Sequence, residues 1–167
     1  VMLKAIKLAQ ASASRPIRAV IAGGSTRSGY LAGMRSLARK LGIKAKFLGT
    51  VPHRRIDGVY RQADAFICPS QKHEAFGLVN VEAMASGLPV IASNNGGIKE
   101  IVRHNRNGLL IRAYRSPRAF ADAISRLAND SSARKRMALQ ARKDAVARFS
   151  WKASADRLSR LYASKFS

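Results

Sequence analysis

The sequence predicts an α/β fold in which helices cover both faces of a parallel sheet. Short apolar runs of four or five residues alternate with longer stretches in which apolar residues recur at helical spacing. Most of these runs are apolar at consecutive positions, as is typical of strands buried on both faces. The length of 167 residues and a hydrophobic content of 47% fit one globular domain.

The predicted elements follow one another in a regular order. The break at Ser14–Pro16 and the glycines Gly42 and Gly87 mark the ends of helices. The predicted helices cover residues 1–10, 27–41, 53–62, 77–86, 98–102, 116–129, 131–148 and 151–165. The predicted strands cover residues 19–22, 45–48, 64–68, 89–92 and 108–111. Ligands of such sheets bind beyond the carboxyl ends of the strands, here the loops that begin at Gly23, Gly49, Ser70 and Ser93.

The distribution of glutamate singles out one of these loops. The chain has only three glutamates, Glu74, Glu82 and Glu100. Glu74 and Glu82 are eight positions apart and frame the dipeptide Phe76-Gly77, where a helix is predicted to begin. The segment 74–82 therefore lies where the fold predicts a ligand.

The residue types in this segment suit a ligand that contains a sugar and a phosphate. The amides of Phe76, Gly77 and Leu78 lie in the first helical turn, where they lack intrahelical partners and attract anions. The Glu82 carboxylate can accept hydrogen bonds from the vicinal hydroxyls of a ribose, and Glu74 can reach hydroxyls beyond the phosphate. The alternative is that Glu74 only stabilises the helix dipole and that Glu82 is a solvated surface residue.

Several segments, in this order, resemble the donor-binding domain of retaining GT-B glycosyltransferases of family 4. They are Glu74–Glu82 with its two glutamates, Ala85-Ser86-Gly87-Leu88-Pro89-Val90, Gly96-Gly97-Ile98-Lys99-Glu100-Ile101-Val102 and Asn107-Gly108-Leu109-Leu110. The resemblance implies a Rossmann-like sheet, the C-terminal half of a GT-B fold, with its first strand missing from this chain. Residues 1–167 are then a nucleotide-sugar-binding domain, with 151–165 as a C-terminal helix that crosses to another domain.

The resemblance also implies roles for individual residues. Glu74 is expected to be the catalytic carboxylate that contacts the transferred sugar, and Glu82 is expected to hold the ribose. The other expected donor-binding residues are Phe76, Gly77 and Leu78 for the diphosphate, Val51 for the base, and Gly23 and Gly24 in the turn that faces the donor.

The implied reaction is transfer of a hexose from a nucleotide diphosphate sugar to an acceptor with retention. No metal and no other cofactor are expected, and the chain contains no Asp-x-Asp motif. The phosphate-binding Arg and Lys of the family and its acceptor-binding N-terminal domain are expected upstream of Val1, and Lys99 stands where the family commonly has proline. This chain alone is therefore expected to bind a nucleotide weakly and to be inactive.

The charge leaves other functions open. The net charge of +22, from 31 Lys and Arg against 9 Asp and Glu, favours anionic partners such as a membrane surface or nucleic acid. Residues 63–97 carry a net charge of −2, so the predicted site is the least basic region, which argues against nucleic acid. The alternatives are a nucleotide-sugar epimerase on the same scaffold, a basic binding module, and a homologue that has lost its activity.

The remaining signals narrow the chemistry. Residues 24–29 have the glycine spacing of a P-loop but lack the Lys-Ser/Thr that must follow, which excludes that motif. The three histidines have no metal-ligand spacing. The single Cys68 favours a reducing compartment, so the expected location is the cytoplasm, including the inner face of the membrane. Trp151 is expected to pack in the core.

Overall fold

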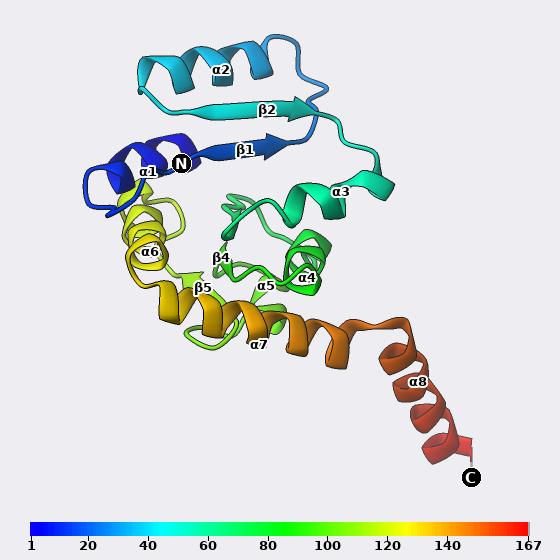
Figure 1. Cartoon of the computed structure of the whole chain (residues 1–167). Helices are drawn as coiled ribbons and strands as arrows, with labels where there is room; N and C mark the ends of the chain where they lie inside the picture. The colour runs from blue at the N-terminus through cyan, green and yellow to red at the C-terminus, as the bar shows by residue number, and fades with distance from the viewer. Residues whose placement is uncertain (167) are drawn as a thin grey trace.

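The computed structural model describes residues 1–166, in which parallel strands alternate with helices (Figure 1). The strands are β1 (Ala19–Ala22), β2 (Ala45–Gly49), β3 (Phe66–Cys68), β4 (Val90–Ser93) and β5 (Gly108–Ile111). The helices are α1 (Met2–Gln10), α2 (Tyr30–Lys40), α3 (His53–Tyr60), α4 (Leu78–Ala85), α5 (Ile98–Ile101), α6 (Pro117–Asn129), α7 (Ser131–Phe149) and α8 (Trp151–Phe166). Each predicted element is present in the predicted order, which confirms the α/β class.

The observed boundaries differ most from the predicted ones where a turn precedes a helix. Helix α2 begins at Tyr30, three residues later than the predicted start at 27. Gly29 has a φ of 73° and Tyr30 N donates to Arg27 O at 3.3 Å, so residues 27–29 form a turn. Apolar periodicity alone does not separate such a turn from the first turn of the helix.

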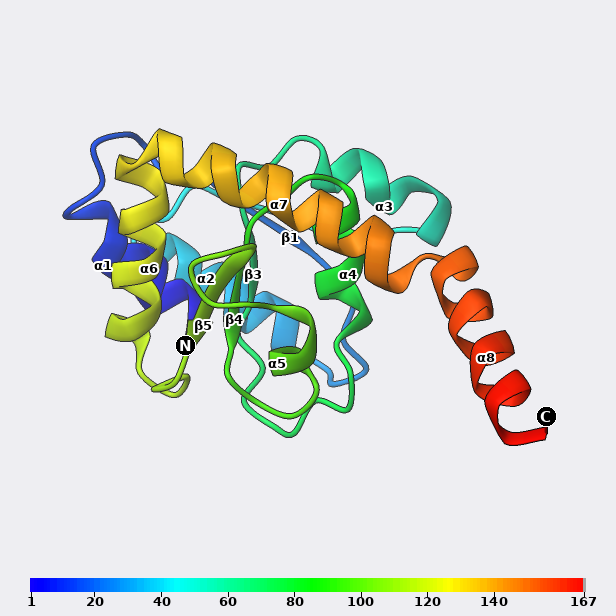
Figure 2. The same cartoon turned by 90° about the horizontal axis from the view of Figure 1, so that it is seen from below.

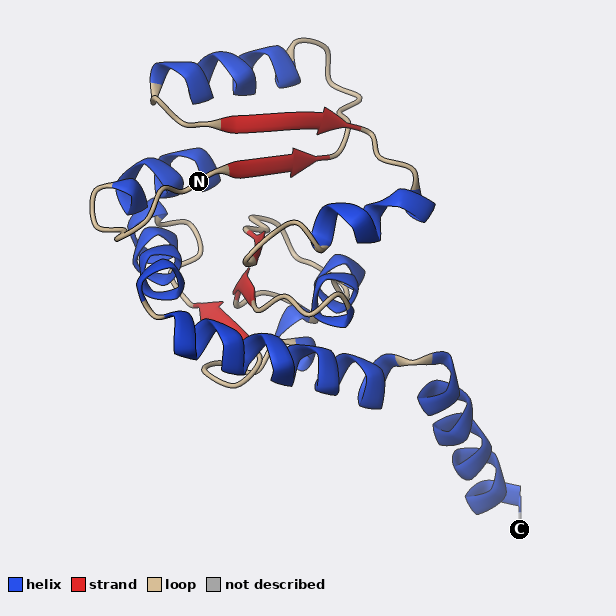
Figure 3. Ribbon diagram, in the orientation of Figure 1, coloured by secondary structure: helices blue, strands red, loops and turns tan. Residues whose placement is uncertain are grey.

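The strands are parallel, as predicted, and they form two separate hydrogen-bonded sheets. Strand β1 pairs with β2, with Ala19 opposite Ala45, and β4 pairs with β3 on one side and β5 on the other. Within residues 1–166, no hydrogen-bonded ladder joins β1 to β3, and Figure 3 shows the two groups of strands apart. The apolar pattern of a strand predicts its burial but not which strand lies beside it.

The three-stranded sheet is covered on both faces, as predicted. Strand β4 is buried at all four positions, and its side chains alternate between two apolar clusters. Ile91 joins the cluster built around α1 and α6, whereas Val90 and Ala92 join the cluster built around α4, α5 and α7. Figure 2 shows α7 running along one side of the molecule, past β5 and α4.

A buried carboxylate ties α7 to the segment before β5. Asp144 Oδ2 accepts a hydrogen bond from Asn107 Nδ2 at 2.9 Å, and Oδ1 accepts bonds from Gln140 at 2.6 Å and Arg106 at 3.4 Å. Burial by itself would raise the pKa of Asp144, but these three hydrogen bonds outweigh it and hold the pKa below its ordinary value. Asp144 is therefore a stabilising group of the core.

Helix α8 extends away from the rest of the molecule (Figure 2). Its first residue, Trp151, is 93% exposed, and Leu158 and Leu161 are 54% and 55% exposed. The expectation that Trp151 packs in the core is wrong, because the chain turns at Ser150 and directs the helix outward. Within the described residues, no helix is both long and apolar enough to cross a membrane.

Candidate functional site

The start of α4 presents free main-chain donors, as the sequence predicts. Gly77 precedes the helix with a φ of 91°, so the first helical residue is Leu78 rather than the predicted 77. In the described part of the chain, the amides of Phe76, Gly77 and Leu78 donate no hydrogen bond. Phe76 and Leu78 are 40% and 59% exposed, whereas Gly77 between them is buried. Three free amides at the positive end of a helix can bind a phosphate group.

Gly77 is needed for this geometry. A Cβ atom at Gly77 would lie 2.6 Å from Asn80 Nδ2, which donates to Gly77 O at 3.0 Å. Asn80 is fully buried, so the turn before α4 is held from the interior. The same added Cβ would lie 3.4 Å from Glu74 Cγ, which places the Glu74 side chain beside the helix start.

The loop that carries Glu74 is held by the glycine pair before α5. Gly97 N donates to Glu74 O at 2.8 Å, and the Asn95 side chain donates to Lys72 O. A Cβ atom at Gly97 would lie 2.2 Å from Ala75 O, so only glycine permits this approach. In the sequence, the Gly96-Gly97 pair is known only from its resemblance to the GT-B family. In the structure, the pair holds the loop that carries Glu74.

Glu82 is engaged by α3, which the sequence does not predict. Its side chain is 23% exposed. Oε2 accepts a hydrogen bond from the Tyr60 hydroxyl at 3.1 Å, and Oε1 lies 3.3 Å from His53 Nε2. Burial and the nearby Glu82 carboxylate raise the pKa of Tyr60, so its hydroxyl stays protonated and donates. Glu82 is therefore an oriented acceptor and not a solvated surface residue.

The loops after β1 and β2 lie against each other. Gly23 N donates to Gly49 O at 2.7 Å, and Gly23 has a φ of 135°. A Cβ atom at Gly24 would lie 2.7 Å from Thr50 Oγ1. The structure thus brings Gly23 and Gly24 next to the loop that carries Val51, and α3, which begins two residues after Val51, connects this loop to Glu82.

The predicted residues therefore form two groups. Glu74, Phe76, Gly77 and Leu78 gather at the start of α4, and Glu82 follows one turn along the same helix. Gly23, Gly24 and Val51 gather at the ends of β1 and β2. Among the described residues, no hydrogen bond or ion pair joins the β1 and β2 loops directly to the Glu74 loop, so α3 and α4 are the connection between the two groups.

Sequence reasoning missed Tyr60, His53 and Asn80. His53 directly follows the predicted base-side loop, and this position was the available signal for it. Tyr60 carries a polar group at the end of a short helix before a buried strand. This pattern does not predict which residue its hydroxyl contacts. Within residues 1–166, no group of three or more His, Cys, Asp or Glu side chains is arranged to hold a metal ion.

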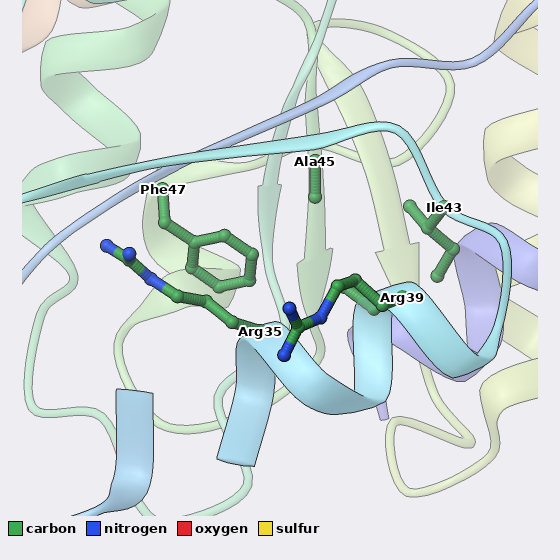
Figure 4. Close-up of a pocket in the computed structure, with 6 residues that line it drawn as sticks. Arg35, Arg39, Ile43, Ala45 and Phe47 are labelled. Atoms are coloured by element: carbon green, nitrogen blue, oxygen red, sulfur yellow. The ribbon is translucent and has the colours of Figure 1, made fainter. Parts of the chain in front are cut away.

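A shallow hollow of about 310 Å³ lies elsewhere, between α2 and β2 (Figure 4). It is lined by Arg35, Ala38, Arg39, Ile43, Ala45 and Phe47. The Arg35 guanidinium stacks on the Phe47 ring, with its central carbon 5.6 Å from the ring centroid. None of the predicted site residues lines this hollow.

This chain is similar to known proteins in sequence and in fold. Residues 1–144 match the family described as glycosyl transferases group 1. The D-inositol 3-phosphate glycosyltransferase of Corynebacterium jeikeium is 39% identical over 167 residues, covering 97% of this chain and 39% of that protein. Anabaena HepE, solved in complex with UDP and glucose, superposes with a TM-score of 0.83 at 26% identity, covering 97% of this chain and 44% of that one.

A third comparison gives the same result. Sucrose-phosphate synthase from Thermosynechococcus elongatus superposes with a TM-score of 0.82 at 30% identity, over 98% of this chain and 42% of that chain. The chain thus spans about two fifths of the length of these relatives, which is 39%, 44% and 42% respectively. Sequence and structure together show that this chain belongs to the glycosyl transferases group 1 family and has the fold of a GT-B C-terminal domain.

Proposed function

We propose that this chain is the donor-binding domain of a family 4 glycosyltransferase that moves a hexose from a nucleotide diphosphate sugar to an acceptor with retention. The observation that carries the proposal is the start of α4, where free amides lie between two carboxylates, Glu74 and Glu82. Anabaena HepE, which shares the fold, has been solved with UDP and glucose. A nucleotide diphosphate sugar contains a ribose, a diphosphate and a sugar in the order in which Glu82, the amides and Glu74 follow one another.

In the proposed complex, each group has one task. Glu82 accepts hydrogen bonds from the ribose hydroxyls, and Val51, Gly23 and Gly24 border the base. The amides of Phe76, Gly77 and Leu78 hold the diphosphate. Glu74 contacts the transferred sugar, and it is the proposed catalytic residue.

The proposed contribution to catalysis is electrostatic. As the bond between the sugar and the diphosphate breaks, negative charge grows on the leaving phosphate. The amino-terminal end of α4 carries about half a positive elementary charge and would face that group in the proposed complex. A metal ion is not required for this step, and we propose that the reaction is metal-independent, with the remaining stabilisation supplied by basic side chains.

We further propose that the intact protein contains an N-terminal acceptor domain and a strand that lies between β1 and β3. Three observations support this. The chain spans 39% of the corynebacterial relative, the inner edges of β1 and β3 have no strand partner in residues 1–166, and α8 exposes apolar side chains. Helix α8 would then cross to the acceptor domain. Turnover would need the whole protein, and this chain alone would bind the donor weakly.

The basic surface suggests where the protein acts. Helix α7 exposes Lys135, Arg136, Arg142 and Lys143, and α8 adds further basic residues. We propose a cytoplasmic enzyme whose basic helices contact the anionic inner face of the membrane, where each basic residue contributes about 1 kcal/mol. Binding to phosphatidylcholine vesicles should increase when phosphatidylglycerol is added and decrease with salt. Binding that ignores lipid charge would contradict this part of the proposal.

The first experiment measures the thermal stability of the chain with UDP, GDP and ADP. A ligand that binds the folded state raises the melting temperature by mass action, and saturation at about 100 times Kd adds about 2.7 kcal/mol. We expect one nucleotide to stabilise the chain more than the others. If none does, while duplex DNA binds at low salt, the chain is a basic binding module and the proposal fails.

The second experiment uses the full-length protein and a nucleotide-sugar donor. We expect Glu74→Ala and Glu82→Ala to slow sugar transfer, EDTA to leave the rate unchanged, and the product to keep the anomeric configuration of the donor. Unchanged transfer in both variants would contradict the assigned roles. An epimerised nucleotide sugar that forms without acceptor would instead support the epimerase alternative.

A further inference from the structure

Helix α3 holds the Glu82 carboxylate from two directions. The Tyr60 hydroxyl donates to Oε2 at 3.1 Å, and His53 Nε2 lies 3.3 Å from Oε1. Tyr60 and His53 are the last and first residues of α3, and α3 packs beside α4 (Figure 1). One short helix therefore contacts both oxygens of the same carboxylate.

The two contacts differ in how firmly they are held. Tyr60 is 7% exposed, and its ring packs edge-on against Phe66 with the centroids 5.5 Å apart. The His53 side chain is 88% exposed and is free to move into solvent. A buried ring fixes the position of its hydroxyl, whereas an exposed ring is easily displaced. The Tyr60 contact is therefore held in place by the core, whereas the His53 contact can be exchanged for solvent or a ligand.

The Tyr60 contact leaves the carboxylate able to bind a ligand. A carboxylate offers about four acceptor positions on its two oxygens, and Tyr60 occupies one of them. Displacement of His53 would free a second position on Oε1. Two hydroxyl groups on neighbouring carbon atoms could then donate to a carboxylate whose orientation is already set.

We propose that Tyr60 is a positioning residue that orients Glu82 to read the ribose hydroxyls, so that the site distinguishes ribonucleotides from 2′-deoxyribonucleotides. This inference rests on the proposed function, in which Glu82 holds the ribose. Tyr60 does not touch the nucleotide and acts only through Glu82. His53 occupies the place of a ribose hydroxyl until the nucleotide binds.

The test compares the binding of UDP and 2′-deoxy-UDP by calorimetry to the wild type and to Tyr60→Phe. One hydrogen bond corresponds to about a fivefold change in affinity, so we expect the wild type to prefer UDP by about fivefold or more. Tyr60→Phe should weaken UDP binding about fivefold and 2′-deoxy-UDP binding less than twofold, so that the preference narrows. Tyr114→Phe, which removes the hydroxyl of a partly buried tyrosine that does not contact Glu82, is the control and should change the affinity for neither nucleotide.

Two further variants separate positioning from general damage. Glu82→Asp keeps the charge but withdraws the carboxylate from the Tyr60 hydroxyl, and it should narrow the preference as Tyr60→Phe does. Adding Tyr60→Phe to Glu82→Ala should have no further effect on UDP affinity. If Tyr60→Phe lowered the affinity for UDP and for 2′-deoxy-UDP by the same factor, the preference would be unchanged. That result would overturn the inference while leaving the proposed function intact. Failure of UDP, GDP and ADP to bind the wild type would instead remove the proposed function.

Discussion

The hydroxyl of Tyr60 donates a hydrogen bond to the carboxylate of Glu82 across 3.1 Å, from the end of α3 to the middle of α4. This bond joins α3, which follows the loop that carries Val51, to α4, whose start carries the free amides. It also connects a buried aromatic residue to an acidic residue that the sequence alone would allow to be a solvated surface residue.

This bond predicts the titration of the tyrosines. Burial and the Glu82 carboxylate raise the pKa of Tyr60, so its folded-state pKa is above the unfolded value of about 10. The stability that this shift contributes is fully present below pH of about 10 and decreases as the pH rises further. In an ultraviolet titration, one of the four tyrosines should ionise later than the others, and Tyr60→Phe should remove that late step. A late step that persists in Tyr60→Phe would contradict the assignment.

Glu82→Gln should weaken nucleotide binding without unfolding the chain. The substitution keeps the shape and one carbonyl oxygen for the Tyr60 hydroxyl but removes the charge that strengthens hydrogen bonds from a ribose. Loss of a charge-assisted bond costs about 1.5–3 kcal/mol, so Kd should rise about 10- to 150-fold in calorimetry. Glu100→Gln is the matched control, because Glu100 is exposed and its bond to Arg148 uses the main-chain oxygen. Equal losses in both variants would show that charge in general, and not this position, matters.

Gly97→Ala should displace the loop that carries Glu74. The new methyl group would lie 2.2 Å from Ala75 O, so the loop must move. We expect a loss of about 1–3 kcal/mol in the free energy of unfolding, measured with urea, and weaker donor binding. Gly33→Ala is the control, because no atom lies within 4 Å of the added carbon in the middle of α2. That variant should gain about 0.5–1 kcal/mol, and a Gly97→Ala variant that behaves in the same way would refute the close approach.

Asp144→Asn should destabilise the chain in a pH-dependent manner. The hydrogen bonds from Gln140, Arg106 and Asn107 hold the pKa of Asp144 below its ordinary value. Their stabilisation is therefore present above the unfolded pKa of about 3.9 and is lost as the pH falls through the folded pKa. Urea unfolding at pH 7 should show a loss of about 1.5–3 kcal/mol, and the difference from wild type should shrink in acid.

Asp122→Asn is the control for Asp144→Asn. Asp122 pairs with Arg118 on the same helix, but its side chain is 63% exposed, so its loss should cost less than about 0.5 kcal/mol. A similar loss in both variants at pH 7, or a difference for Asp144→Asn that does not depend on pH, would contradict the buried network.

The fluorescence of Trp151 should report a solvated side chain. It is the only tryptophan, and it is 93% exposed. We expect a red-shifted emission maximum and efficient quenching by acrylamide in the isolated chain, at all protein concentrations tested. In the full-length protein, a domain that covers α8 should shift the emission to the blue and reduce the quenching. A protected tryptophan in the dilute isolated chain would mean that α8 folds back.

The sequence predicts the strands and helices well because burial leaves a periodic apolar pattern. The four consecutive apolar positions around Ile91 predict a strand covered on both faces, and the structure buries all of β4. The site at the start of α4 is predictable for a similar reason, since Gly77 and the flanking glutamates lie within nine residues. Local chemistry of this kind can be read along the chain.

The rest depends on contacts between distant residues. Tyr60 and Glu82 are 22 positions apart, and no spacing rule pairs them. The split between the β1–β2 pair and the three-stranded sheet depends on lateral neighbours, which apolar runs do not encode. The wrong prediction for Trp151 has a different cause. A large apolar side chain is usually buried, and only the direction of α8 exposes this one.

The separation of the two sheets has a consequence for local unfolding. Because no ladder joins β1 to β3 in residues 1–166, opening the β1–α2–β2 unit breaks no main-chain bond of the β3–β4–β5 sheet. Amide hydrogens of β1 and β2 should therefore exchange with solvent deuterium faster than those of β4, through openings that leave the larger sheet intact. The β1–α2–β2 unit, which borders the proposed base site, would then be more plastic than the larger sheet, and nucleotide binding would slow its hydrogen exchange first.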